Sequence, residues 1–328
     1  MRGKLFRRDE LVLVSLILVI ACVFAVTVWI PANWEAGLLR AESLWDIPVS
    51  GVGPWFSGWT FGDGQAFAVI AVDPLGADLG TSLGDPGYRY MRAGFGWAAW
   101  ALSLGQPQFV PYAITVVGLI SVVLLFFLAW KLRQIVGPSA WLLCLNPVVF
   151  VALARGTAES LGSLLLAAAM LSGGAWWAAA LGVVRPSYLL GLAARFRLLQ
   201  PGLLVCATVV LLSAWRFGWD ISQYMGRLTI PGLGYLQAAD IGSWIVFVVA
   251  LVTLIVGVRR RDWSWVASGL FIICLSPDVV ESFRNSWRAA GVLPVLWAFG
   301  PGFLKRQVVV EAESAVRVQP AVHVADVA

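Results

Sequence analysis

The sequence predicts an all-α integral membrane protein, a polytopic bundle of about eight to ten transmembrane helices, and three observations support this prediction. Hydrophobic residues make up 60% of the 328 residues. Charged residues make up only 12%, whereas soluble domains usually carry about 25%. Uncharged apolar stretches of roughly bilayer length recur along most of the chain.

These apolar stretches define eight candidate spans, since a helix of about 20 residues covers the ~30 Å of a hydrocarbon core. They are Leu11–Ile30, Phe109–Trp130, Pro138–Ala154, Leu161–Val184, Leu198–Trp215, Ile241–Val258, Trp263–Ser276 and Ala289–Leu304. Gly173-Gly174 can split the fourth span into two shorter helices. If residues 88–104 also dip into the bilayer, the count rises to about ten.

Charge asymmetry predicts the orientation of these spans. With eight crossings, only eight of the 23 Lys and Arg residues lie outside, against 12 of the 18 Asp and Glu residues, as the positive-inside rule requires. We expect a plasma-membrane protein with both termini in the cytoplasm. Residues 1–306 form one membrane domain, with 31–108 as an extracytoplasmic loop that holds short interfacial helices. Residues 307–328 are expected to be a disordered cytoplasmic tail.

Several classes of function are disfavoured. The net charge of +5 comes from basic residues beside apolar segments, so it indicates topology rather than nucleic-acid binding. The four cysteines are far apart and lie inside apolar segments, and the single histidine, His323, lies in the tail. A disulfide framework, a histidine-ligated metal and a Ser-His pair are therefore not expected. The sequence predicts no resident cofactor and leaves room for a divalent cation.

Asp63 stands in the tetrapeptide GDGQ, directly before the apolar run AFAVIA. An aspartate at that place can cap a helix by accepting backbone N–H bonds. It can also act as a general base at the membrane surface and take the proton of an attacking hydroxyl. The two interpretations are compatible. Asp73 follows in the same stretch and is a further candidate for substrate contact.

Asp85, Arg89 and Arg92 follow the spacing i, i+4, i+7, which places them on one face if the segment is helical, with Tyr88 beside Arg92. An Asp85–Arg89 surface pair is the simplest interpretation. Two arginines one turn apart also suit a phosphate group, because guanidinium groups bind its oxygens in a bidentate manner.

Two further groups of charges interrupt or flank apolar spans. Arg155 and Glu159 flank Gly156-Thr157-Ala158, and charges so close to hydrocarbon tend to pair or to mark sites. Glu281, Arg284 and Arg288 are spaced i, i+3, i+7 and allow the same two interpretations. By contrast, Arg185 ends the fourth span, where we expect a cytoplasmic topology charge.

Four motifs in order resemble a known family over about residues 10–190. They are FGDGQAFAVIAVDP, GDPGYRYMRAGFGWAAWALSLG, LNP with ARGTAESLGSLLLA, and RPSYLL. The chain resembles bacterial polytopic glycosyltransferases of the GT-C superfamily, and among them the relatives of mannosyltransferases that use polyprenyl-phosphate sugars. It departs from the family pattern at Gly62 and Ala66, where aromatic residues are common.

The resemblance implies an inverting transfer of a sugar from a polyprenyl-phosphate donor to an extracytoplasmic glycan, lipid or protein acceptor. Asp63 and Gln65 match the DGQ motif, which implies that Asp63 is the general base. Arg89 and Arg92 match the YRYxR motif, near the donor phosphate. The substrate-contacting set expected with Asp63 is Gln65, Asp73, Asp85, Tyr88, Arg89, Arg92, Arg155, Glu159, Glu281 and Arg288.

Two other functions stay open. A transporter or flippase of a lipid-linked or anionic substrate should carry charged residues at mid-bilayer in several spans. Here the charges lie at span ends and in outer loops, which favours surface chemistry. A membrane scaffold without catalytic activity is the third possibility.

Overall fold

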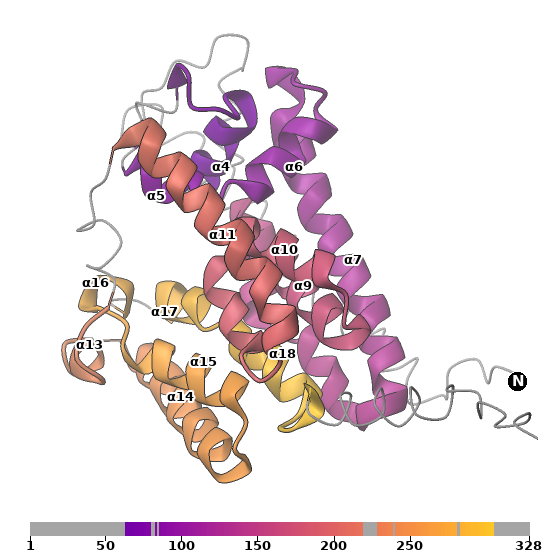
Figure 1. The fold of residues 1–328 in the computed structure, drawn as a ribbon, viewed down its shortest axis with the longest axis vertical. Helices are drawn as coiled ribbons and strands as arrows, with labels where there is room; N and C mark the ends of the chain where they lie inside the picture. Colours follow the sequence, from indigo (N-terminus) through magenta and orange to yellow (C-terminus); the bar gives the residue numbers. More distant parts are fainter. Residues whose placement is uncertain are drawn as a thin grey trace, which may run out of the picture.

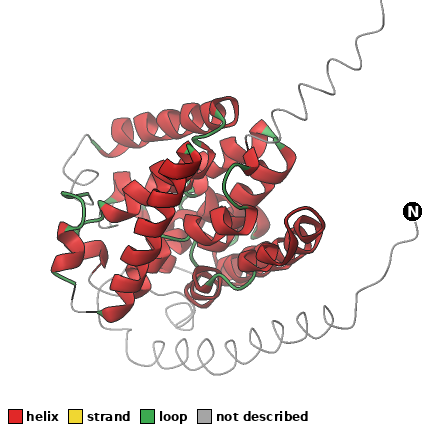
Figure 2. Cartoon of the chain, turned by 90° about the horizontal axis from the view of Figure 1, so that it is seen from below, coloured by secondary structure: helices red, strands yellow, loops and turns green. Residues whose placement is uncertain are grey.

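A computed structural model describes residues 63–79, 83, 85–218, 228–238, 240–280 and 283–304. Within these residues the chain is helical and forms no strand longer than one isolated bridge, between Leu228 and Leu275 (Figure 2). The all-α prediction is therefore confirmed for the described part. The predictions about Leu11–Ile30, the beginning of the 31–108 loop and the 307–328 tail lie outside it.

Figure 1 shows how the described helices are arranged. They are α4 (Asp63–Val72), α5 (Pro86–Tyr90), α6 (Gly94–Leu102), η3 (Pro107–Phe109), α7 (Val110–Val136), η4 (Gly137–Leu143), α8 (Pro147–Arg155), α9 (Glu159–Ser172), α10 (Ala175–Val184), η5 (Pro186–Leu192), α11 (Phe196–Phe217), α13 (Leu233–Leu236), α14 (Ile241–Arg260), α15 (Trp263–Ile273), α16 (Pro277–Val280), α17 (Phe283–Ala289) and α18 (Val292–Phe299).

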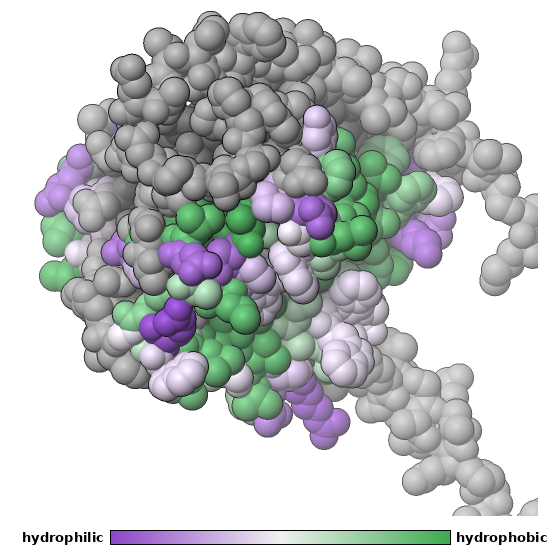
Figure 3. Space-filling view, turned by 90° about the horizontal axis from the view of Figure 1, so that it is seen from above, coloured by the Kyte–Doolittle hydropathy of each residue, from purple (hydrophilic) through white to green (hydrophobic). Residues whose placement is uncertain are grey.

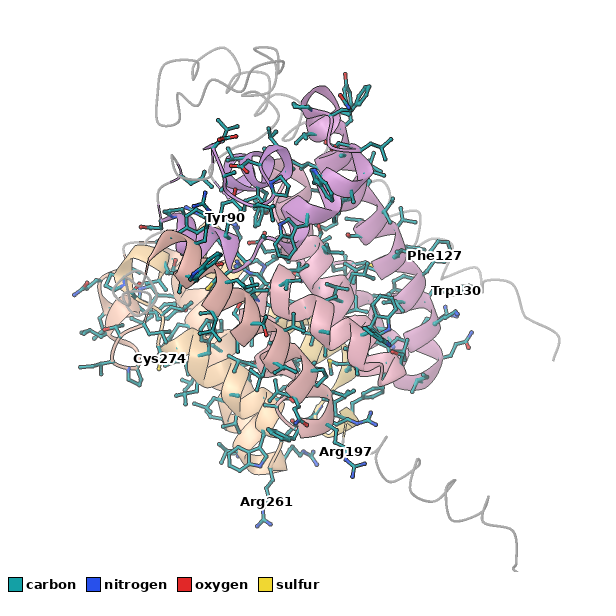
Figure 4. The ribbon with its side chains drawn as sticks, turned by 45° about the horizontal axis from the view of Figure 1, so that its top comes forward. Tyr90, Phe127, Trp130, Arg197, Arg261 and Cys274 are labelled. Carbon is teal, nitrogen blue, oxygen red and sulfur yellow. The ribbon has the colours of Figure 1, made fainter. Side chains whose placement is uncertain are left out.

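Three helical segments are long and apolar enough to cross a membrane: Tyr112–Leu143, Phe196–Phe217 and Ile241–Arg260. Each of them exposes large apolar side chains, for example Phe127 on α7, Leu211 on α11 and Val248 on α14. Figure 4 shows Phe127 pointing away from the bundle. Apolar side chains on the outside are expected where helices face hydrocarbon instead of water.

The other predicted spans that the structure describes appear as shorter pieces. Pro138–Ala154 is broken between η4 and α8, where Asn146 caps the new helix by accepting the Val148 N–H at 3.1 Å. Pro147 follows at the first helical position, where its missing N–H costs nothing. α15 and α18 contain only 11 and 8 residues, which is short of the ~20 that cross a bilayer.

The fourth predicted span is not one helix. Gly173 adopts a left-handed conformation (φ +67°) after α9, and Gly174 precedes α10, so the chain reverses at this pair. The reversal brings Arg185, just after α10, back to Glu159 at the start of α9, with 3.3 Å between Nη2 and Oε1. The split helix is confirmed. Our interpretation of Arg185 as a topology charge at the opposite end is wrong.

The two ends of the bundle differ. Helices α4, α5 and α6 lie together at one end, at the top of Figure 1, and we call residues 63–103 the α4–α6 layer. Arg216, near the end of α11, reaches this layer and donates from Nη2 to the Gly76 carbonyl at 2.9 Å. Arg197 and Arg261 lie at the opposite end, far from Tyr90 (Figure 4). Described hydrophilic side chains lie in small groups between apolar ones at the α4–α6 end (Figure 3).

Candidate functional site

Helix α4 begins at Asp63, as predicted. Its side chains from Ala66 to Ala71 are all buried, so the helix is packed on every side and does not present the amphipathic surface that we expected. Gly96 on α6 makes the packing possible, because a Cβ there would come within 2.6 Å of Ile70 Cγ2. The side chains of Asp63 and Gln65 are outside the described atoms, so the structure gives only the backbone positions of these two residues, in the first turn of α4.

Asp73 closes the turn after α4. Its two carboxylate oxygens accept the N–H groups of Ala77 and Asp78, both at 2.9 Å. The hydroxyl of Tyr90 donates to the Asp73 carbonyl, which ties α5 to this turn. Burial, and then the charge of Asp73, raise the pKa of Tyr90 above its usual value, so the phenol stays protonated and can donate. These contacts give Asp73 a structural role.

The arginines of the layer are arranged differently from the predicted helical face. Asp85 is left-handed (φ 55°) and precedes α5, which ends at Tyr90. Arg92 therefore lies in the turn before α6, and no continuous helix joins it to Asp85. The expected contact with Tyr88 is present: the Arg92 guanidinium carbon lies 4.4 Å from the centre of that ring.

Arg92 is buried, with 3% of its surface exposed, and its guanidinium also lies 5.7 Å from the ring of Phe67. Phe67 stands one helical turn after Asp63 on α4. Arg89 approaches the other ring of this group, with 5.8 Å to the centre of Tyr88. Asp63 thus lies on the same helix as Phe67, whose ring contacts Arg92. The ring of Tyr88 contacts both Arg92 and Arg89.

A second polar group lies in the bundle, and we call Glu159, Arg185 and Arg288 the Glu159 cluster. Glu159 is fully buried. Its Oε1 accepts from Arg288 Nε at 3.0 Å and Nη2 at 2.8 Å, while Arg185 Nη2 lies at 3.3 Å. Residues from α9, from α17 and from the end of α10 therefore meet at one carboxylate oxygen. Such a meeting is stable because a buried charge is paired with opposite charge.

The walls of the cluster depend on two glycines. At Gly162 a Cβ would lie 3.0 Å from Cβ of Arg185, so the glycine gives this arginine room to lie close to α9. At Gly291 a Cβ would collide with the Tyr188 hydroxyl. That hydroxyl is fully buried and donates to the Arg288 carbonyl at 3.5 Å.

The structure therefore brings together Glu159 and Arg288, two residues that the sequence proposed in separate groups. Sequence reasoning missed Arg185 as their partner. The signal was present in Gly173-Gly174, because a chain reversal there returns Arg185 to the start of α9. Arg155 is the last residue of α8, but its side chain is outside the described atoms, and Glu281 is outside the described residues.

Comparisons with protein-family models, curated proteins and solved structures found no match for this chain. Over the described residues, no three His, Cys, Asp or Glu side chains are grouped so that they could hold a metal ion. The described fold and site define an all-helical protein with three helices able to span a membrane, an arginine-bearing layer at one end and a buried ionic cluster.

Proposed function

We propose that this protein is an inverting glycosyltransferase of the bacterial plasma membrane. It moves a hexose, such as mannose, from a polyprenyl-phosphate donor to an extracytoplasmic glycan, lipid or protein acceptor. One observation supports this proposal most: Phe67, one turn after Asp63, lies against the guanidinium of Arg92. A candidate base and candidate phosphate ligands therefore belong to one packed layer.

The reaction assigns a role to each of these groups. Asp63 takes the proton of the acceptor hydroxyl while that oxygen attacks the anomeric carbon of the sugar. The bond from that carbon to the phosphate oxygen breaks, the configuration inverts, and the electron pair leaves on the lipid phosphate. Arg89 and Arg92 stabilise the negative charge of the departing phosphate, since guanidinium groups remain charged and donate in pairs.

The membrane has a role in this proposal as well. The long helices α7, α11 and α14 anchor the chain, and the isoprenoid tail of the donor stays in the hydrocarbon while its phosphate meets the α4–α6 layer. The layer must then face outward. In a variant with the four native cysteines replaced, a cysteine at Ala77 should be labelled on intact cells, and one at Arg260 only after permeabilisation. The reverse pattern contradicts the proposed orientation.

The decisive experiment is a transfer assay. Purified protein is incubated with a panel of radiolabelled polyprenyl-phosphate sugars and with membrane extract as the source of acceptor. We expect one donor to lose its label to an extract component, with the anomeric configuration inverted. Absence of transfer from every donor, by protein shown to be folded, contradicts the proposal.

Transport of an anionic or lipid-linked substrate is the second candidate, because Glu159 is fully buried and meets arginines from two other segments. Ionisable residues inside a membrane protein commonly line substrate pathways. Proteoliposomes separate the two functions. Movement of a labelled polyprenyl-phosphate sugar across the bilayer, without any sugar transfer, favours the transporter.

A further inference from the structure

We propose that Arg185, together with the hydroxyl groups of Thr157 and Ser160, forms a binding site for the phosphate group of a membrane lipid. This site lies below the α4–α6 layer and is separate from Arg89 and Arg92. The inference deepens the proposed function by naming a second place for the lipid phosphate. It can be tested by binding alone, so the two ideas can fail independently.

Arg185 is held less tightly than the other arginine of the cluster. Arg288 contacts Glu159 Oε1 through two nitrogens, at 2.8 and 3.0 Å. Arg185 contacts the same oxygen through Nη2 only, at 3.3 Å. Its Nε is buried and has no hydrogen-bond partner in the described part of the chain. The Nε edge of a guanidinium group can donate to an oxyanion in a bidentate manner.

Two hydroxyl groups next to Glu159 are also buried without a partner. Thr157 and Ser160 are 1% and 0% exposed, and their side-chain oxygens have no hydrogen-bond partner among the described atoms. A buried hydroxyl without a partner is unfavourable, and native structures contain few such groups. Both residues flank Glu159 in the chain, at the start of the helix whose Glu159 contacts Arg185.

The start of α9 also favours an anion, because helix N-termini attract anions and α9 has no side-chain cap at Ala158. Two guanidinium groups approach one carboxylate oxygen at this place.

The depth of the cluster identifies the source of the phosphate as a lipid. Gly173, at the end of α9, lies beside Arg195, with 3.2 Å between the position of its absent Cβ and Nη1. From there α9 rises 14 residues to Glu159, roughly 21 Å, while α11 rises 22 residues from the same end, roughly 33 Å. The cluster therefore lies within the length of a membrane-spanning helix. A phosphate carried on a lipid can reach this depth along the bundle.

The test is binding of radiolabelled polyprenyl monophosphate to the full chain in nanodiscs of neutral phosphatidylcholine, in an Arg89→Ala, Arg92→Ala background so that the proposed donor site does not contribute. We expect Arg185→Gln to weaken binding about tenfold or more, since a hydrogen bond to a charged group is lost. Arg185→Lys should recover part of the loss, because lysine keeps the positive charge but lacks the paired N–H donors of the guanidinium group. The double variant Thr157→Val, Ser160→Ala should weaken binding severalfold. Ser268→Ala is the matched control, because it removes another buried hydroxyl without a described partner, on α15.

A second variant is expected to change the binding affinity in the opposite direction. Glu159→Gln should strengthen binding, because it releases Arg185 from the competing carboxylate. The proposal is overturned if Arg185→Gln binds like wild type, if Ser268→Ala loses as much as the double variant, or if Glu159→Gln does not strengthen binding. Competition by inorganic phosphate at the same concentration as the lipid contradicts the lipid source. Tight, Arg185-dependent binding without sugar transfer retains this site and removes the proposed enzyme.

Discussion

Arg92 and Arg185 are both largely buried, and their surroundings differ. Arg92 lies against the rings of Tyr88 and Phe67, and each such contact attracts a cation by about 0.5–2 kcal/mol. Arg185 also lies near a ring, that of Tyr188 at 5.8 Å, but in addition it pairs with the carboxylate of Glu159, which also binds Arg288. The contacts of Arg92 described here stay within the α4–α6 layer, whereas the Glu159 cluster connects distant segments.

This difference separates two kinds of residue. Removal of the Glu159 carboxylate should act first on stability, because three segments depend on it. Substitutions of Asp63 and Arg92 should act first on turnover, because the buried apolar side chains of α4 and the Tyr90–Phe217 contact hold the layer together without them. The four predictions below test this division, from the largest expected effect to the smallest.

Replacing Glu159 with Ala should destabilise the protein by about 3–5 kcal/mol, because two largely buried arginines lose their carboxylate. Chemical unfolding in detergent, with thermal unfolding as a second probe, measures the loss. Asp240→Ala serves as control, since it removes a part-buried helix cap to the Gly242 N–H at 2.8 Å that is worth about 1 kcal/mol. Equal losses in the two variants contradict the role of Glu159 as the common partner.

Replacing Asp63 with Asn should leave the unfolding transition nearly unchanged and lower turnover about 10²-fold or more, because Asn keeps the shape and loses the base. The transfer assay measures turnover. Asp73→Asn is the matched variant in the turn at the other end of α4, and it should lower stability more than turnover. A folded and fully active Asp63→Asn protein moves the base to Asp73, Asp85 or Glu159. If the variant fails to fold, capping is the main role of Asp63.

Replacing Arg92 with Ala should weaken use of the donor about tenfold, and Arg92→Lys should weaken it less, because lysine keeps charge but cannot donate in pairs. The same order is expected for Arg89. Donor KM and kcat in the transfer assay provide the measurement, with Arg197→Ala at the opposite end as control. Wild-type donor use by the alanine variants of both Arg89 and Arg92 removes the phosphate role of the layer.

Replacing Tyr90 with Phe should cost only about 1 kcal/mol, because one hydrogen bond to the Asp73 carbonyl is lost while the ring keeps its contact with Phe217. Tyr112→Phe, on an exposed part of α7, should change the unfolding midpoint less. The effect should not depend on pH near neutrality, since burial and the charge of Asp73 raise the pKa of Tyr90 and the phenol stays protonated in both states. A loss similar to that of Glu159→Ala contradicts the division between the layer and the cluster.

Local features of the structure could be predicted well. The start of α4 at Asp63 follows from a glycine-flanked aspartate before an apolar run. The contact of Tyr88 with Arg92 also followed from their spacing, although the intervening helix ends at Tyr90. Long uncharged runs predicted α7, α11 and α14, because the hydropathy of a span depends only on one continuous segment of the sequence.

Features that depend on chain reversal could not be predicted. One uncharged run reads alike as a single helix or as α9 followed by α10, and only the left-handed Gly173 decides between them. The sequence likewise predicted that α4 lies at the membrane interface. In the structure its side chains are buried, and this burial depends on close packing at Gly96.

Composition and apolar runs alone thus determined that the described chain is helical and that some of its helices suit a bilayer, because hydrocarbon requires internally satisfied backbone bonds. Only the tertiary structure decided which charges meet. Glu159, Arg185 and Arg288 are up to 129 residues apart in the chain, and nothing in their local spacing indicates a common carboxylate. Ion pairing depends on distance in space, and that distance is set by the turn at Gly173-Gly174 and by the room left at Gly162.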